Sequence, residues 1–167
     1  TNLTVDARGT TGQVLPNTGR DIRVTYTGVE QSPETNVVIN EIMYNPAVSE
    51  ATYIELYNRS ATYSFDLSGW RLNGVDYTFP PGTIITNGGF LVLAKNRAAF
   101  ASAYGAGIPV IGIYDGQLDD GGETLSRMRP GTEPAADLLV DRVTYDDDPP
   151  WPASADGQGG SLQLMDP

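Results

Sequence analysis

The chain has 167 residues, of which 40% are hydrophobic, and a formal net charge of −11. It contains neither cysteine nor histidine, which excludes disulfides, thiolate metal sites and catalysis by a thiol or an imidazole. An acidic surface repels phosphates and anionic lipid headgroups, and no apolar run reaches the length of a membrane span. We therefore expect no nucleic-acid partner and no direct membrane insertion.

The first 32 residues differ from the rest of the chain. Three acids and three arginines balance within residues 1–32, so the whole acidic excess lies in residues 33–167. Residues 2–6 and 21–27 alternate apolar and polar side chains and predict two strands. Segment 31–34 contains a proline and predicts an extended linker. We therefore expect a β-hairpin over 1–32, as the end of an upstream domain or as an accessory hairpin, and one domain over 33–167.

Short runs of strand-forming residues separated by glycine and proline continue through the main domain. Such a rhythm is typical of a β-sandwich. In chain order, the predicted strands are 37–44, 52–58, 69–72, 75–79, 83–85, 90–94, 108–114, 123–128, 138–145 and 161–165.

Alternation within these strands predicts the core. Ile54 and Leu56 share one face of their strand, because successive side chains of a strand point to opposite faces. The apolar run 90–94 predicts a strand buried on both faces, with Leu93 in the core. Trp70, at the entry to a strand, is expected to fill the space between two sheets.

Two local signals define a turn and a helix. Asn73-Gly74 is a strong signal for a two-residue hairpin and is expected to join the strands on either side directly. The alanine-rich segment 96–104 predicts one short helix, with Asn96 as its N-cap and Gly105 at its end.

Eight short motifs follow one another in an order that resembles the bacterial members of the lamin tail domain family. The resemblance covers about residues 37–166 and includes Val38–Ile42, Tyr53–Asn58, Asp66–Trp70, Phe79–Thr83, Gly88–Ala94, Gly116–Glu123, Asp141–Tyr145 and Pro150–Leu162. It implies an all-β, immunoglobulin-like sandwich without a known catalytic site, within an exported multidomain protein. The core is expected to rest on packing alone, since the disulfide of antibody domains is unavailable.

The N-terminal hairpin has a resemblance of its own. Asn2–Val5 and Val24–Gly28 are similar to the end of the immunoglobulin-like segment that precedes a lamin tail domain in secreted proteins with a CotH-type kinase domain. None of the kinase's own residues is present in this chain.

Acidic residues in two glycine-flanked loops are the candidate calcium ligands, because calcium takes six to eight oxygen ligands. They are Asp119, Asp120, Glu123, Asp146, Asp147 and Asp148, and their spacing does not match an EF-hand loop. The alternative is ordinary turn chemistry, in which aspartate serves the backbone. We expect no other cofactor.

Glu41 and Glu55 are the candidates for a hydrolytic acid–base pair, since their strands are expected to be neighbours. The alternative is a structural ion pair with Arg71, on a third neighbouring strand.

These features favour a non-catalytic interaction or tethering module of a larger secreted or cell-surface protein. Its expected partners are other domains of the same parent chain or cell-surface proteins, and its expected location is extracellular or at the cell surface. The alternative is a carbohydrate-binding or calcium-dependent adhesion module, in which Trp151 stacks on a sugar. A hydrolase using Glu41 and Glu55 is the weakest alternative.

Overall fold

The computed structural model describes residues 2–5, 11, 19–23, 31–133 and 136–166. The chain divides into two units, Thr1–Glu30 and Gln31–Pro167. In the first unit, β1 (Asn2–Val5) pairs antiparallel with β2 (Arg20–Arg23). The predicted strand residues 6 and 24–27 lie outside the described residues.

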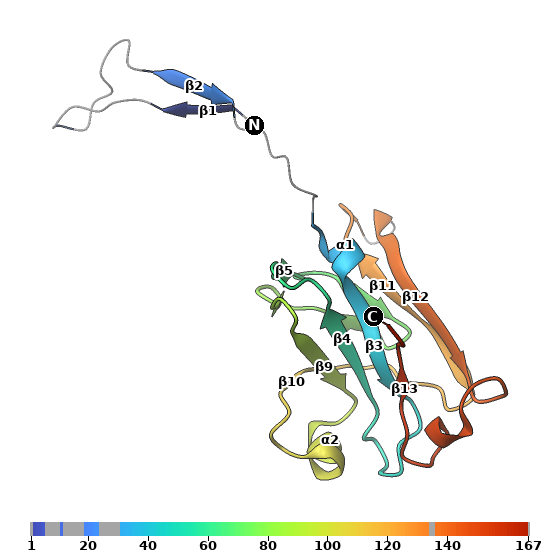
Figure 1. Ribbon diagram of the computed structural model, residues 1–167. Coiled ribbons are helices and arrows are strands. Elements are labelled where there is room, and N and C mark those ends of the chain that lie inside the picture. The colour runs from blue at the N-terminus through green and yellow to red at the C-terminus, as the bar shows by residue number, and fades with distance from the viewer. Residues whose placement is uncertain (1, 6–10, 12–18, 24–30, 134–135, 167) are drawn as a thin grey trace. The chain divides into compact units, whose positions relative to one another are not determined.

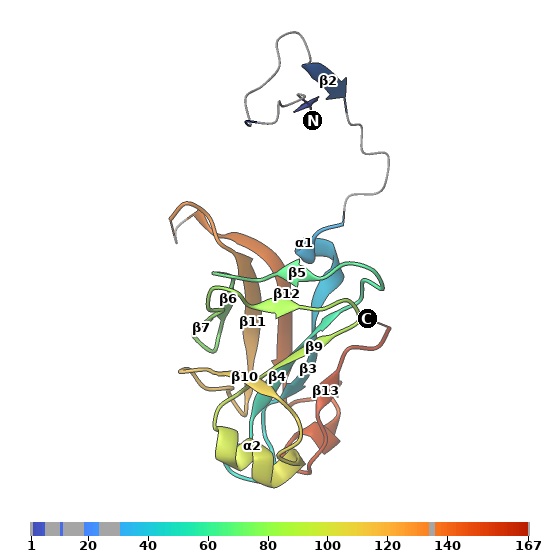
Figure 2. The ribbon, with the colours of Figure 1, turned by 90° about the vertical axis from the view of Figure 1, so that its left-hand side faces the viewer.

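The second unit contains two main sheets, seen as separate layers in Figures 1 and 2. In the five-stranded sheet the order is β10 (Val110–Ile113), β9 (Phe90–Ala94), β4 (Tyr53–Asn58), β3 (Val37–Met43) and β13 (Leu162–Gln163). In the four-stranded sheet it is β12 (Leu138–Asp146), β11 (Gly122–Arg129), β6 (Arg71–Asn73) and β7 (Tyr77–Thr78). A further pair joins β5 (Phe65–Asp66) to β8 (Ile84–Ile85). The prediction of an all-β immunoglobulin-like sandwich is confirmed.

The main core contains the four residues that the sequence predicted for it. Ile54, Leu56 and Leu93 are fully buried, and Trp70 is 4% exposed. All four belong to one cluster of buried hydrophobic residues. The alternation of β4 therefore predicted the buried residues correctly, and the apolar run of β9 did so for residues 91–94, whereas Phe90 is 54% exposed.

A bulge in β3 allows two apolar residues of opposite parity to enter this core. Ile39 pairs with Leu56 and Glu41 with Glu55, so the extra residue Asn40 shifts the register. Ile39 and Ile42 are consequently both buried, which an unbroken strand would not permit, because residues three apart point to opposite faces.

Helix α2 (Arg97–Tyr104) confirms the predicted short helix. The side chain of Asn96 caps it by accepting hydrogen bonds from the backbone N–H groups of Ala98 and Ala99, at 2.9 and 3.2 Å. Phe100 packs with residues of β9 and β10 in a second, smaller cluster. This contact buries the outer face of β9. Among the described residues, no helix has the length and apolar character needed to cross a membrane.

The turn after β6 is longer than predicted. Leu72 pairs with Tyr77, so Asn73-Gly74 begins a four-residue loop instead of forming a two-residue one. Val75 lies in this loop and is fully buried. The added length lets an apolar side chain reach the core, and Gly74 takes the positive φ of 103° that glycine tolerates best.

The predicted extended linker at 31–34 is also wrong in part. Pro33–Asn36 forms a single helical turn, α1, with proline at its start, where the missing N–H costs nothing. Helices α1 and α2 lie toward opposite ends of the sandwich (Figures 1 and 2). A second short turn, η2 (Ala153–Ala155), precedes β13.

Candidate functional site

A buried arginine lies beside the core tryptophan. Arg127 on β11 is 1% exposed, and its guanidinium carbon lies 5.0 Å from the centroid of the Trp70 ring, a cation–π distance. The same guanidinium donates hydrogen bonds to the carbonyl oxygens of Pro33 and Val37, at 3.2 and 2.5 Å. Burial lowers the pKa of Arg127 to about 10. The sequence predicted a core that rests on packing alone. The buried arginine and its hydrogen bonds show that this expectation is wrong.

Sequence reasoning missed Arg127, although one signal was available. Leu125 and Arg127 are two residues apart on one strand, and both are buried. Side chains at this spacing share a face, so an inward-facing Leu125 places Arg127 inward as well.

In the first acidic loop, the carboxylates of Asp119 and Glu123 accept hydrogen bonds from nearby protein groups. Glu123 accepts hydrogen bonds from the N–H of Asp119 and from the hydroxyl of Tyr145, both at 3.1 Å. Asp119 in turn accepts one from the N–H of Gly121 at 2.8 Å. Burial raises the pKa of Glu123. Two of these three hydrogen bonds come from backbone N–H groups of the loop, as in ordinary turns.

The second acidic loop is built in the same way. Asp146 accepts a hydrogen bond from the N–H of Asp148 at 3.0 Å, and it stands opposite Gly122 in the β11–β12 ladder. The two loops are therefore adjacent. Nevertheless, in the part of the chain that the structure describes, no three acidic side chains come together in a group that could hold a metal ion.

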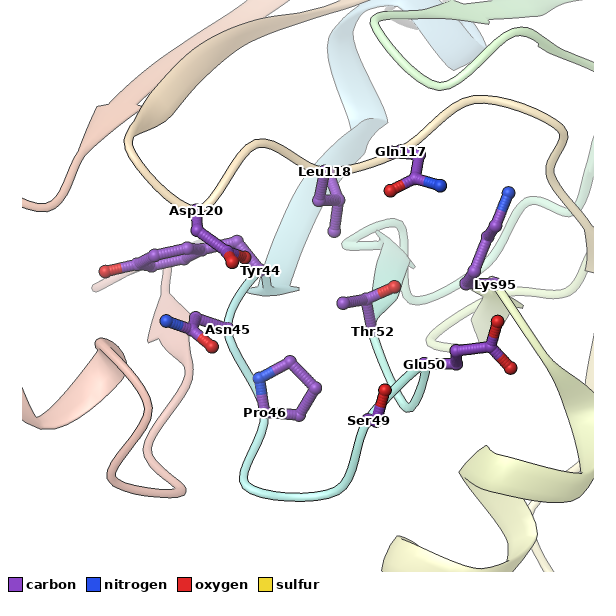
Figure 3. Close-up of a pocket in the computed structure, with 10 residues that line it drawn as sticks. All are labelled: Tyr44, Asn45, Pro46, Ser49, Glu50, Thr52, Lys95, Gln117, Leu118 and Asp120. Carbon is purple, nitrogen blue, oxygen red and sulfur yellow. The ribbon is translucent and has the colours of Figure 1, made fainter.

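A polar pocket of about 260 Å³ opens near these loops, between the β3–β4 connection and the segment that precedes β11 (Figure 3). Lys95 donates to the carbonyl oxygens of Asp115 and Gly116, at 2.9 Å each. Glu50 accepts a hydrogen bond from Asn96 at 2.9 Å. The charged groups of these two lining residues are thus engaged by the protein itself.

Tyr44 lines the same pocket, and its ring points away from Gln117 and Lys95 (Figure 3). The ring lies 4.9 Å from that of Tyr145, and the residue is 1% exposed. Its hydroxyl has no hydrogen-bond partner among the described residues. Burial raises the pKa of Tyr44, and the charges of Asp156 and Asp147 raise it further.

The two candidate hydrolytic glutamates are brought together, but without Arg71. Glu41 on β3 stands directly opposite Glu55 on β4. Arg71 lies in the other sheet, where it pairs with Asp137, so the predicted Glu–Arg pair is wrong. Asn40, the extra residue of the bulge, instead donates a hydrogen bond to Glu55 at 2.8 Å.

Glu41 is held by several neutral donors. The hydroxyls of Tyr53 and Ser161 donate to its Oε1 at 2.7 and 2.5 Å, and the amide of Gln163 donates to the same atom at 3.1 Å. Burial raises the pKa of Glu55, and the charge of Glu41 adds to this effect. Both carboxylates line a cavity of about 190 Å³ together with Tyr53 and Tyr104.

β12 is an edge strand of the four-stranded sheet, as β7 is at the other end of that sheet and β10 and β13 are in the five-stranded sheet. β12 pairs with β11 on one side, and no strand of the described residues pairs with its other side. Leu138 and Leu139 on β12 are 51% and 54% exposed. Asp141 accepts a hydrogen bond from the N–H of Ile39 at 3.3 Å. We call this free side of residues 138–146 the β12 edge.

An apolar pocket of about 150 Å³ lies beside the β12 edge. Residues of β3, β12, β13 and the C-terminal segment line it: Ile39, Asn40, Ile42, Val143, Trp151, Leu162, Gln163 and Leu164. Trp151 is partly buried and packs against the main core, so it closes this side of the sandwich while one face borders the pocket. The sequence indicated Trp151 as a candidate binding residue. It did not predict the apolar pocket, because local sequence patterns do not show the order of strands across two sheets.

The family comparison agrees with this architecture. The family model of the lamin tail domain matches residues 30–147. The chain belongs to the lamin tail domain family. The match spans β3 to β12, which includes both glutamates, the buried Trp70–Arg127 pair and the β12 edge. As a lamin tail domain, the chain has the immunoglobulin-like fold that its two sheets display.

One curated relative matches about two thirds of this chain. It is a protein of Methanosphaerula palustris named "Probable cobyric acid synthase", 34% identical over 124 residues. The matched region is 69% of this chain but only 24% of the relative, so the chain spans about a quarter of that protein's length. No solved structure matches the chain at a significant level.

Proposed function

We propose that this lamin tail domain is a non-catalytic interaction module of a larger secreted or cell-surface protein, and that it binds another domain of the same protein along the β12 edge. The observation that carries the proposal is the nine-residue strand Leu138–Asp146, which is unpaired on one side within the described residues and borders an apolar pocket. A free strand edge is a template for pairing with another chain.

The composition of the edge supports a specific kind of partner. Leu138 and Leu139 provide exposed apolar surface at one end, and the pocket beside Val143 and Trp151 can take an apolar side chain. Asp146 to Asp148 make the other end acidic. An extended segment with apolar residues and at least one basic residue fits this pattern, since complementary charges favour correct docking.

The comparison supports a modular role. In the Methanosphaerula palustris relative, the matched region is a quarter of a longer protein, which is the arrangement expected of a domain combined with others. The name of that relative describes the whole protein, and it gives this segment no activity of its own.

The other functions have less support. A hydrolase needs an acid and a base that can exchange protons with a substrate, whereas three neutral donors hold one oxygen of Glu41. For calcium-dependent adhesion, no metal-binding group of three acids is present in the described residues. For sugar stacking, Trp151 is partly buried against the core.

Binding between separately produced parts of the parent protein tests the proposal. We expect calorimetry to detect binding of this domain to a neighbouring domain, and the double variant Leu138→Asp, Leu139→Asp to abolish most of it. The matched control is Ile111→Asp, which charges an exposed apolar position of β10. Absence of binding, or an equal loss with the control, would contradict the β12 edge as the docking surface.

A further inference from the structure

A cavity on the outer face of the five-stranded sheet combines two carboxylates with aromatic walls. Tyr53, Phe100 and Tyr104 form a cluster of rings, with centroid distances of 5.4 Å from Tyr53 to Phe100 and 5.0 Å for the other two pairs. Glu41 and Glu55 face the same space of about 190 Å³. Helix α2 supplies Phe100 and Tyr104, and the sheet supplies the other three residues.

Within the described part of the chain, no lysine or arginine forms an ion pair with either carboxylate. Like charges directly opposite each other on antiparallel strands destabilise the pairing, and Glu41 stands opposite Glu55. The ion pairs within the described residues join Arg71 to Asp137 and Arg129 to Glu34, so neither neutralises this cavity.

The two cations at the start of α2, one just before the helix and one at its first residue, are engaged elsewhere. Lys95 donates to the carbonyl oxygens of Asp115 and Gly116, and Arg97 donates to that of Val110. The hydrogen bonds in the cavity itself come from neutral groups, among them the hydroxyl of Tyr53. A cation that neutralises the pair would therefore come from outside these residues.

We infer that this cavity receives the cationic end of a lysine or arginine side chain from a partner polypeptide. An ammonium or guanidinium group has several donors and can bridge two carboxylates, and aromatic faces attract cations. Val92 and Ile108 complete the lining and suit the aliphatic stem of such a side chain. Ile108 is 44% exposed and extends the apolar surface beyond the cavity. In the partner, the residue next to the lysine or arginine can cover Ile108.

This site is linked to the apolar pocket beside the β12 edge, because Asn40 and Gln163 line that pocket and donate hydrogen bonds to Glu55 and Glu41. Glu41 and Glu55 project from the outer face of the five-stranded sheet, opposite to the face on which Ile42 and Ile54 are buried. The cavity therefore adds a second contact of stated chemistry to the module.

The test is an NMR titration of the full chain with capped amino acids. The probes are N-acetyl-lysine-N-methylamide and N-acetyl-arginine-N-methylamide, and the neutral control of similar shape is the corresponding norleucine compound. We expect saturable shift changes at Val92, Phe100 and Tyr104 with the basic probes and none with norleucine. Glu55→Gln should weaken binding at least about fivefold, and Tyr104→Leu should weaken it as well.

Three results would overturn the inference. If the norleucine compound bound with the same affinity as the lysine compound, the cavity would not recognise charge. Equal weakening by Glu133→Gln, which removes an exposed loop carboxylate, would show only a general attraction to the acidic surface. Binding of n-butylammonium without binding of either capped amino acid would indicate a site for free amines and not for a polypeptide.

Discussion

Arg127 and Trp70 form a buried cation–π pair, with the guanidinium carbon 5.0 Å from the centroid of the indole ring. Trp70 is tied into the chain through its backbone, which donates to Leu67 at 3.0 Å and accepts from Phe79 at 2.9 Å. Arg127 continues the connection to the carbonyl oxygens of Pro33 and Val37. One pair thus joins the four-stranded sheet to α1 and to the start of β3.

Trp70→Ala should destabilise the domain by about 3–5 kcal/mol, because the removed ring leaves a large cavity in the main core. That is a large part of the stability of an ordinary domain. Trp70→Phe should cost less, since it keeps most of the apolar volume. Denaturant unfolding of the three proteins measures both effects. Equal stability of Trp70→Ala and the wild type would show that Trp70 is not a core residue.

Arg127→Met should cost about 2–4 kcal/mol, because it leaves the buried carbonyl oxygen of Val37 without its arginine donor. Arg127→Lys should recover part of the loss, since it keeps the charge but not the two-pronged donor geometry. Arg142→Met is the matched control, at an exposed position of β12, and should change stability by no more than about 0.5 kcal/mol. Thermal melts that rank Arg142→Met with Arg127→Met would refute the structural role of Arg127.

The domain should fold when residues 1–32 are deleted. The residues from Gln31 onward form their own compact unit, and Arg127 anchors Pro33 directly. We expect the shortened chain to unfold in one cooperative thermal transition with retained near-ultraviolet circular dichroism. A molten or insoluble product would mean that the N-terminal hairpin belongs to the sandwich.

Glu55→Gln should raise stability at neutral pH. The pKa of Glu55 is raised above 4.5 by burial and by Glu41, so the folded state binds this proton more tightly than the unfolded state. The resulting stabilisation is complete below the unfolded pKa and is lost as the pH rises through the folded pKa. The variant removes the charge, so it should gain up to about 1 kcal/mol at neutral pH and nothing well below pH 4.5. Melts at both pH values test this, and a less stable variant at neutral pH would contradict it.

The local features of this fold were predictable from the sequence because short-range patterns determine them. The alternation of β4, the apolar run of β9 and the Asn96 cap were all confirmed. The bulge at Asn40 and the buried Val75 were not predicted, because each depends on how a distant strand packs against the residue.

The candidate sites show the same limit. The sequence placed Glu41 and Glu55 on neighbouring strands, which the register confirms, but it placed Arg71 beside them. Arg71 lies in the other sheet, and no local pattern records which strands share a sheet. The aromatic wall of the cavity was missed for a related reason, since Phe100 and Tyr104 come from a helix that folds back over β9.

Hydrogen exchange of the β12 amides is the measurement that tests the interaction module most directly. Exchange is followed by mass spectrometry in the isolated chain and in the full parent protein, with β4 as the internal reference because strands pair with it on both sides. We expect the amides of residues 138–146 to exchange more slowly in the parent protein, while those of β4 stay unchanged. Identical exchange of β12 in both proteins would contradict a docking role for its free edge.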